Sequence, residues 1–148
     1  MTYKNALISL FLISLALACG KERAKVANAT PEARACGSTH AMVGHVGEFS
    51  NKAHGVSGKA EIVSDCEIKI TNFNYDGGGI GVRIYGAKDR QFKRGKSLSD
   101  ELVGTKFNDG QLNVFLPEGT TFDNIDSLSV WCVDYAVDFG SLYFAQPI

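Results

Sequence analysis

From Ser57 onward, short apolar runs alternate with clusters of turn-forming residues, and no long stretch of helical periodicity follows. The runs are rich in Val, Ile, Phe and Tyr, which is typical of strands. Those at 59–63 and 67–73 flank Ser64-Asp65-Cys66 and predict a hairpin, and further strands are expected at 80–85, 111–116, 128–133 and 141–144. At most, single helical turns are expected at 99–102 and 123–126. The pattern predicts an all-β domain, either an antiparallel β-sandwich or a barrel.

Alternation along a strand predicts which side chains face the core. After Asp65, Cys66 shares a face with Ile68 and Ile70. In the later strand, Cys132 shares a face with Leu128 and Val130, whereas Trp131 lies on the other face with Ser127 and Ser129. Both Cys66 and Cys132 are therefore expected to point inward.

The N-terminus has the pattern of an export signal. Residues 6–18 form a mostly apolar run that is too short to span a bilayer but long enough for a signal peptide. Cys19 directly follows Ala16-Leu17-Ala18, which resembles a lipobox. We expect residues 1–18 to be a lipoprotein signal peptide and Cys19 to carry the acyl chains, palmitate among them. The alternative is a secreted protein in which Cys19 is an ordinary thiol.

Residues 19–46 are expected to form the lipid anchor and a flexible tether, and residues 47–148 the β domain. The stretch 20–34 is polar and has almost no large apolar side chain, so burial cannot offset the entropy cost of ordering it. Gly20 after the cysteine favours the outer membrane over the inner one by the sorting rule of enteric bacteria. The predicted location is thus the bacterial cell envelope, on the periplasmic or the surface side.

Charge and cysteine content narrow the possibilities further. Without residues 1–18, 14 Lys and Arg stand against 16 Asp and Glu, a net charge of −2, which does not fit nucleic-acid binding. With Cys19 lipidated, three cysteines remain in an oxidising compartment, enough for one disulfide and one unpaired thiol. The inward-facing Cys66 and Cys132 are the expected pair, and Cys36 the odd thiol, although Cys36 could compete for either.

Several motifs occur in order: Ala-His-Gly-Val-Ser-Gly at 53–58, Asn-Phe-Asn-Tyr-Asp-Gly-Gly-Gly at 72–79, Val-Phe-Leu-Pro-Glu-Gly at 114–119, Leu-Ser-Val-Trp-Cys-Val at 128–133 and Asp-Phe-Gly at 138–140. Together they resemble the DM13 domain over residues 47–145. The resemblance implies an all-β extracytoplasmic module proposed to act in electron transfer, alongside DOMON-type haem or sugar domains. The family's signature cysteine falls on Cys132, and relatives often carry a second cysteine at the position of Cys66. Haem is possible only through this resemblance.

Other candidate chemistry is limited. His40, His45 and His54 match no common zinc spacing, and neither Cys-x-x-Cys nor Cys-x-x-Cys-His for covalent haem is present. No metal site is therefore predicted. His54 matches the family motif and, with Tyr75 and Asp76, could line a ligand site at the rim, or could instead hydrogen-bond a turn. The glycines at 77–79 precede a strand and not a helix, so they do not form a phosphate loop.

No Gly-x-Ser-x-Gly and no pair of acid–base carboxylates is present, so a stand-alone enzyme is disfavoured. Two hypotheses remain. In the first, the chain is an envelope redox or electron-transfer accessory that uses Cys132, with Cys66, and meets a redox partner in the envelope. In the second, it is a non-catalytic binding or structural module in which Cys66 and Cys132 form an inert disulfide.

Overall fold

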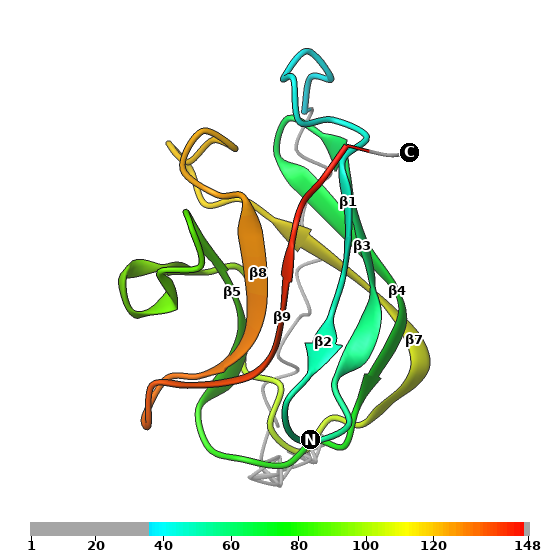
Figure 1. Ribbon diagram of the computed structural model, residues 1–148, viewed down its shortest axis with the longest axis vertical. Coiled ribbons are helices and arrows are strands. Elements are labelled where there is room, and N and C mark those ends of the chain that lie inside the picture. The colour runs from blue at the N-terminus through cyan, green and yellow to red at the C-terminus, as the bar shows by residue number, and fades with distance from the viewer. Residues whose placement is uncertain (1–35, 147–148) are drawn as a thin grey trace, which may run out of the picture. The chain divides into compact units, whose positions relative to one another are not determined.

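The strands form two antiparallel sheets that pack face to face (Figure 1). The computed structural model describes residues 36–146. One sheet has the order β1-β3-β4-β7 and contains β1 Val46–Glu48, β3 Ser57–Ser64, β4 Glu67–Tyr75 and β7 Phe107–Phe115. The other has the order β2-β9-β8-β5-β6 and contains β2 Ser50–Asn51, β5 Val82–Ala87, β6 Lys96–Ser97, β8 Ser127–Cys132 and β9 Val137–Tyr143. The predicted all-β antiparallel sandwich is confirmed.

The predicted hairpin corresponds to β3 and β4, in which Ile62 pairs with Ile68 across the turn. β7 and β9 both begin four residues earlier than predicted. Their first residues include Asp and Gly, which are typical of turns, yet Gly110 pairs with Phe73 and Gly140 with Val130. The expectation of little or no helix is confirmed, and neither 99–102 nor 123–126, where at most a single helical turn was expected, is helical. The short 3-10 helix η1 lies instead at Phe92–Arg94.

Alternate residues of the two sheets meet in one core. The contributing side chains are apolar and fully shielded from solvent. They include Val56, Ala60, Ile62, Ile68, Ile70, Phe73, Val82, Ile84, Leu128 and Val130. Burying one such Val or Ile stabilises the fold by about 1.5–3 kcal/mol. This core fixes the position and orientation of the strands that end at the candidate site.

The outer face of the second sheet is also covered. Trp131 lies on this face, as predicted, and packs with Tyr85 and Phe92 in a separate apolar cluster. The segment between β5 and β6 provides the cover, because the Arg90 backbone N–H donates to Ser127 Oγ over 3.1 Å. Every residue of β8 is buried as a result.

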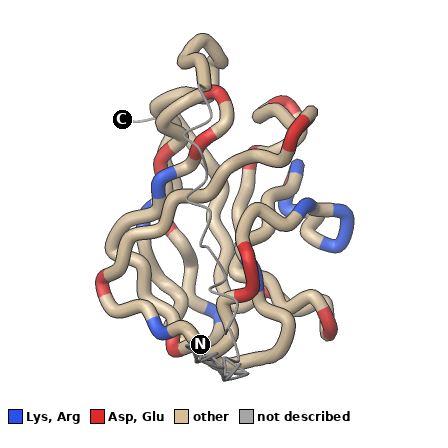
Figure 2. The backbone as a smooth tube through the Cα atoms, turned by 180° about the vertical axis from the view of Figure 1, so that it is seen from behind, with Lys and Arg blue, Asp and Glu red and all other residues tan. Residues whose placement is uncertain are grey.

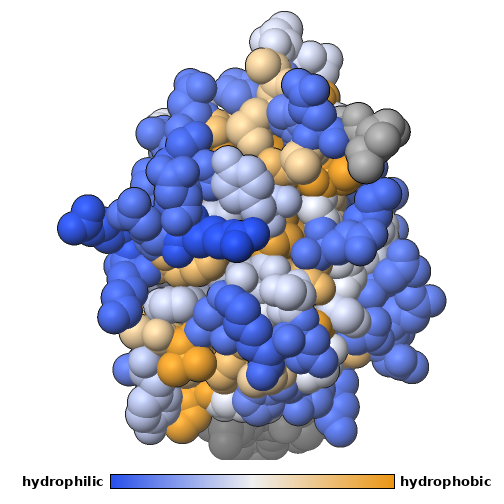
Figure 3. Space-filling view, in the orientation of Figure 1, coloured by the Kyte–Doolittle hydropathy of each residue, from blue (hydrophilic) through white to orange (hydrophobic). Residues whose placement is uncertain are grey.

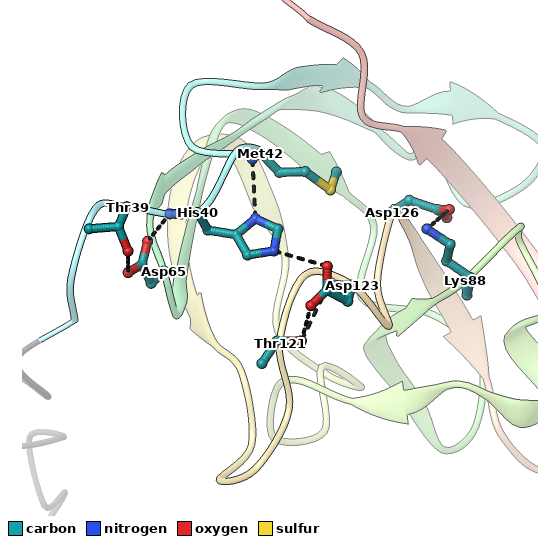
Figure 4. A network of polar contacts seen from close by, with 8 residues as sticks. All are labelled: Thr39, His40, Met42, Asp65, Lys88, Thr121, Asp123 and Asp126. Carbon is teal, nitrogen blue, oxygen red and sulfur yellow. Dashed lines mark hydrogen bonds and ion pairs between the residues drawn. The ribbon is translucent and has the colours of Figure 1, made fainter.

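Residues 36–45, which the sequence assigns to the tether, are fastened to the β3–β4 turn (Figure 4). A disulfide joins Cys36 to Cys66. Beside it, Asp65 accepts hydrogen bonds from the His40 backbone N–H at 2.9 Å and the Thr39 hydroxyl at 3.0 Å. The bond from the His40 N–H is the main reason that the pKa of Asp65 is lowered. The signal peptide at 1–18, Cys19 and the stretch 20–34 lie outside the described residues.

Candidate functional site

Cys132 ends β8 at one end of the sandwich. Its backbone pairs with Val82 of β5 and Val137 of β9. The thiol is only 2% exposed, and it donates a hydrogen bond to the carbonyl oxygen of Ile80 over 3.0 Å. Within the described part of the chain, Cys132 is the one cysteine that forms no disulfide. The prediction that it faces the core is confirmed.

The predicted Cys66–Cys132 disulfide is wrong, because Cys66 bonds to Cys36 with a Cα–Cα distance of 5.6 Å. Cys66 precedes β4, whereas Cys132 lies beside the loop that follows β4. The nine residues of β4 span about 26 Å, far beyond the roughly 7 Å that a disulfide allows between Cα atoms. Cys36, expected to be the odd thiol, is therefore paired, and the odd thiol is Cys132.

Tyr75 lies at the end of β4 that faces Cys132. It is 2% exposed, and its phenol O–H donates to the carbonyl oxygen of Gly78, two residues before Ile80. Burial raises the pKa of Tyr75 to about 12, with smaller electrostatic contributions from the neighbouring Asp76, Cys132 and Glu101. The phenol therefore stays protonated and acts as a hydrogen-bond donor beside the buried thiol.

His54 and Asp76 form a hydrogen-bonded pair at the same rim. His54 Nδ1 lies 3.0 Å from both carboxylate oxygens of Asp76. The imidazole packs on the ring of Phe139 with 4.3 Å between centroids. Asp76 also accepts a hydrogen bond of 2.7 Å from the Gly78 backbone N–H. The three rim residues expected from the sequence, His54, Tyr75 and Asp76, are thus brought together.

We expect the carboxyl of Asp76 to titrate below its ordinary pKa of 3.8. The main cause is the Gly78 N–H, followed by the side chain of His54. Since the folded-state pKa is lowered, Asp76 stabilises the fold above its unfolded pKa, and this contribution is lost as the pH falls through the lowered value. A carboxyl-carbon NMR titration measures the shift. In the His54→Gln variant the pKa of Asp76 should rise, but it should stay below the pKa of Asp76 in the urea-unfolded chain. If the folded variant and the unfolded chain give the same pKa for Asp76, the assigned hydrogen bond from Gly78 is contradicted.

The loop 77–81 packs closely over this end of the core. Gly79 has a φ of +98°, and a Cβ there would lie 2.8 Å from both the Phe139 ring and Val82 Cγ2. A Cβ on Gly78 would lie 2.8 Å from His54 Nδ1. The glycines therefore serve close packing and a left-handed backbone. This agrees with the sequence argument against a phosphate loop.

Several residues that shape this end of the sandwich are not among the site residues expected from the sequence. Phe139 carries the imidazole of His54, and Glu101 accepts a hydrogen bond of 3.1 Å from the Gly81 N–H. A cluster of exposed apolar side chains also lies here, formed by Ile80, Val133, Tyr135 and Val137. Apolar surface is visible over the β8–β9 turn at the lower left of Figure 3. The only available signal was the proximity of Tyr135 and Val137 to the motif that contains Cys132.

The residues around Cys132 do not form a metal-ligand set. Within residues 36–146, no group of three or more His, Cys, Asp and Glu side chains could hold a metal ion. The Cys132 thiol also fits a haem poorly, because it is buried and its hydrogen bond goes to the carbonyl oxygen of Ile80. His40 lies at the opposite end, where its Nδ1 accepts from the Met42 N–H and its Nε2 lies 3.4 Å from Asp123.

Comparison with known proteins identifies similarity over most of the described domain. The family model described as Electron transfer DM13 matches residues 48–144. Protein Skeletor, isoforms B/C, of Drosophila melanogaster is 36% identical over 104 residues, which cover 66% of this chain and 13% of that protein. A cytochrome b561, DM13 and DOMON domain-containing protein of Arabidopsis thaliana is 28% identical over 115 residues, covering 75% of this chain and 13% of that protein.

The chain thus spans about an eighth of the length of these two relatives. No solved structure matches it. Among the described residues, no helix has the length and apolar character needed to cross a membrane.

Proposed function

Because the chain belongs to the DM13 electron-transfer family, we propose that it is an electron-transfer accessory of the bacterial cell envelope with Cys132 as its redox residue. The supporting observation is that Cys132 remains a single buried thiol while Cys36 and Cys66 are paired. A thiol at this position can supply an electron and a proton, which no apolar side chain of similar size can do, and it does so next to the rim loop whose Ile80 carbonyl accepts its hydrogen bond.

The isolation of Cys132 restricts the chemistry. Loss of one electron and one proton from the thiol gives a thiyl radical, and both must pass to an external acceptor. In a two-electron reaction, the Cys132 thiol instead gives up its proton and attacks a disulfide of a partner protein, so that a bond to Sγ forms, the partner's S–S bond breaks and the partner's other sulfur leaves and takes up a proton. The second sulfur must come from a partner because Cys66 is paired and lies at the other end of β4. Cys66, expected to act with Cys132, therefore has no part in this proposal. Cys132 can therefore be oxidised or reduced only together with a partner molecule.

The surroundings of the thiol suit a shielded redox group. Ile80 accepts its hydrogen bond, and Tyr75 holds the neighbouring loop through Gly78. The His54–Asp76 pair lies at the solvent-exposed rim of the same loop, where His54 Nδ1 contacts both carboxylate oxygens of Asp76. Together these groups confine access to the thiol to one end of the sandwich.

The envelope location is part of the proposal. It rests on the apolar run at 6–18 and on Cys19 directly after Ala16-Leu17-Ala18. A lipid anchor at Cys19 would hold the domain at a membrane surface, through residues 20–35, where membrane-bound redox partners can reach it. Nothing in this arrangement calls for a stand-alone catalytic activity.

Voltammetry of the full chain, adsorbed on an electrode from neutral detergent, tests the role of Cys132. We expect a redox wave that is lost in Cys132→Ser and retained in the Cys36→Ser/Cys66→Ser double variant. Alkylation of the chain in denaturant before reduction, followed by mass spectrometry, should label Cys132 alone among the described cysteines. A wave that is unchanged in Cys132→Ser would refute the proposal, as would isolation of a Cys66–Cys132 disulfide. An absorption spectrum of the same sample reports any bound chromophore.

A further inference from the structure

The segment between β5 and β6 concentrates positive charge. Residues 88–96, called the basic turn below, comprise this segment and the first residue of β6, and they contain five Lys and Arg and one Asp, a net charge of +4, whereas the whole chain carries −1. The rest of the chain therefore carries −5. Figure 2 shows Lys and Arg following one another around this loop, which projects from the body of the domain. Such a field attracts an anionic partner and orients its approach.

The basic turn is held firmly on the second sheet. Lys88 Nζ lies 3.1 Å from the buried carboxylate of Asp126, a contact visible in Figure 4 that raises the pKa of Lys88. The Asp89 backbone N–H donates to the other oxygen of Asp126 over 2.8 Å. The guanidinium of Arg90 lies 5.7 Å from the centre of the Tyr143 ring. Because the backbone of the turn is fixed, a partner would not bear the entropy cost of ordering it.

Two cations of the turn are available for a partner. Both residues lie in η1, and the side chains of Lys93 and Arg94 have no hydrogen bond or ion pair with any described residue, whereas the Arg94 backbone N–H donates to the Gln91 carbonyl. They face a hollow lined by Arg90, Gln91, Phe92, Lys93, Arg94 and Trp131. Arg94 also lines a second hollow, together with Lys88, Gln91 and Lys96. Cations that border concave surfaces suit carboxylate side chains that project from another protein.

We propose that the basic turn is the docking surface for an acidic protein, and that this protein is the redox partner of Cys132. Arginine binds carboxylates in a bidentate geometry, which favours Asp- and Glu-rich surfaces. A membrane surface is less suitable, because interfacial sites combine cations with exposed apolar side chains, whereas Phe92 is only 5% exposed. The partner's role in redox chemistry rests on the proposed function, but the docking itself does not.

The position of Trp131 connects the docking surface with the thiol. Trp131 lines the hollow, and the next residue along β8 is Cys132, whose side chain points to the opposite face of the sheet. A partner seated on the turn therefore lies on the opposite face of the sheet from the thiol, a position that suits the one-electron route and not a bond between sulfur atoms. Contacts of this kind are small and charge-steered, so the complex forms quickly and weakens with salt.

Trp131 is the single tryptophan of the chain and provides a direct readout. We expect a deca-glutamate peptide, added to the full chain in neutral detergent, to change the Trp131 fluorescence in a saturable manner that weakens as salt is added. The variant Lys93→Glu/Arg94→Glu should bind the peptide at least about tenfold more weakly. The neutral variant Lys93→Gln/Arg94→Gln should weaken peptide binding less than the charge reversal does. It replaces the charge reversal as the test if the charge reversal disturbs folding.

The control is Lys59→Glu/Lys69→Glu, which changes the net charge equally on the outer face of the other sheet and should leave peptide binding unchanged. Cys132→Ser should also leave it unchanged, so failure of the redox role and failure of docking give different results. Retained binding in the charge reversal overturns the proposal. It is also overturned if phosphatidylglycerol vesicles, but not the peptide, alter Trp131 in a turn-dependent way, or if inorganic phosphate alone gives the same response.

Discussion

Replacing Cys36 and Cys66 together by serine is expected to lower the free energy of unfolding by about 3–4 kcal/mol. The disulfide closes a loop with a sequence separation of 30 residues, and removing it restores conformational freedom to the unfolded chain. It also loosens residues 36–45, whose contacts with Asp65 depend on their being held at the β3–β4 turn. Urea unfolding of the purified full chain measures the loss.

The site around Cys132 should survive this change, because the disulfide precedes β4 and Tyr75 ends it. NMR shifts of His54 and of the Trp131 indole should therefore match the unsubstituted chain. As a control, treating the unsubstituted chain with a thiol reductant should reproduce the stability of the double variant. If reduction leaves the urea midpoint unchanged, the disulfide does not contribute the stability assigned to it.

The hairpin and the direction of Cys132 could be predicted because both depend on local pattern. Alternation around Ser64-Asp65-Cys66 specifies a turn between two half-buried strands, and alternation from Ser127 to Cys132 specifies which side chains face inward. The same pattern does not specify where a residue lies along the strand direction, that is, near which end of the sandwich. Cys66 and Cys132 were both expected near the core, and their separation by the length of β4 could not be inferred. The disulfide partner was predicted wrongly for this reason.

Other features depend on contacts between distant segments. β2 and β6 contain two residues each, too few to show a period. The His54–Asp76 contact joins residues 22 apart in the sequence, and it depends on how the chain turns before β3 and after β4. The cover over Trp131 comes from a polar segment whose composition is that of an ordinary loop. The motifs indicated which residues belong together at the rim, but not the contacts among them.

The concentration of features at the Cys132 end has a structural cause. β4, β5 and β8 all contribute a terminus there, so the loop 77–81 must cross from one sheet to the other within a few residues. Three of its glycines, Gly77, Gly79 and Gly81, have positive φ angles, which other residues rarely adopt. The loop supplies the carbonyl oxygen that accepts the Cys132 hydrogen bond. Access to the thiol is therefore governed by the conformation of this loop.

Gly79→Ala is expected to destabilise the fold by about 2–4 kcal/mol, combining backbone strain with overpacking. The new Cβ would lie 2.8 Å from the Phe139 ring and from Val82, so the loop must shift away from the core. The thiol of Cys132 should then react with an aromatic disulfide reagent about tenfold faster than in the unsubstituted chain. The reason is that local opening of the loop requires less free energy, so the open state is more populated. Urea unfolding and the release of coloured thiolate measure the two effects.

Gly104→Ala is the matched control, because Gly104 has a φ of +80° but nothing within 4 Å of its added Cβ. It should show the strain alone, about 1–2 kcal/mol, without faster reaction of Cys132. If both variants accelerate the thiol equally, the effect follows from general destabilisation and the loop does not control access. If Gly79→Ala alone accelerates it, the loop at 77–81 is the barrier between Cys132 and its reaction partners.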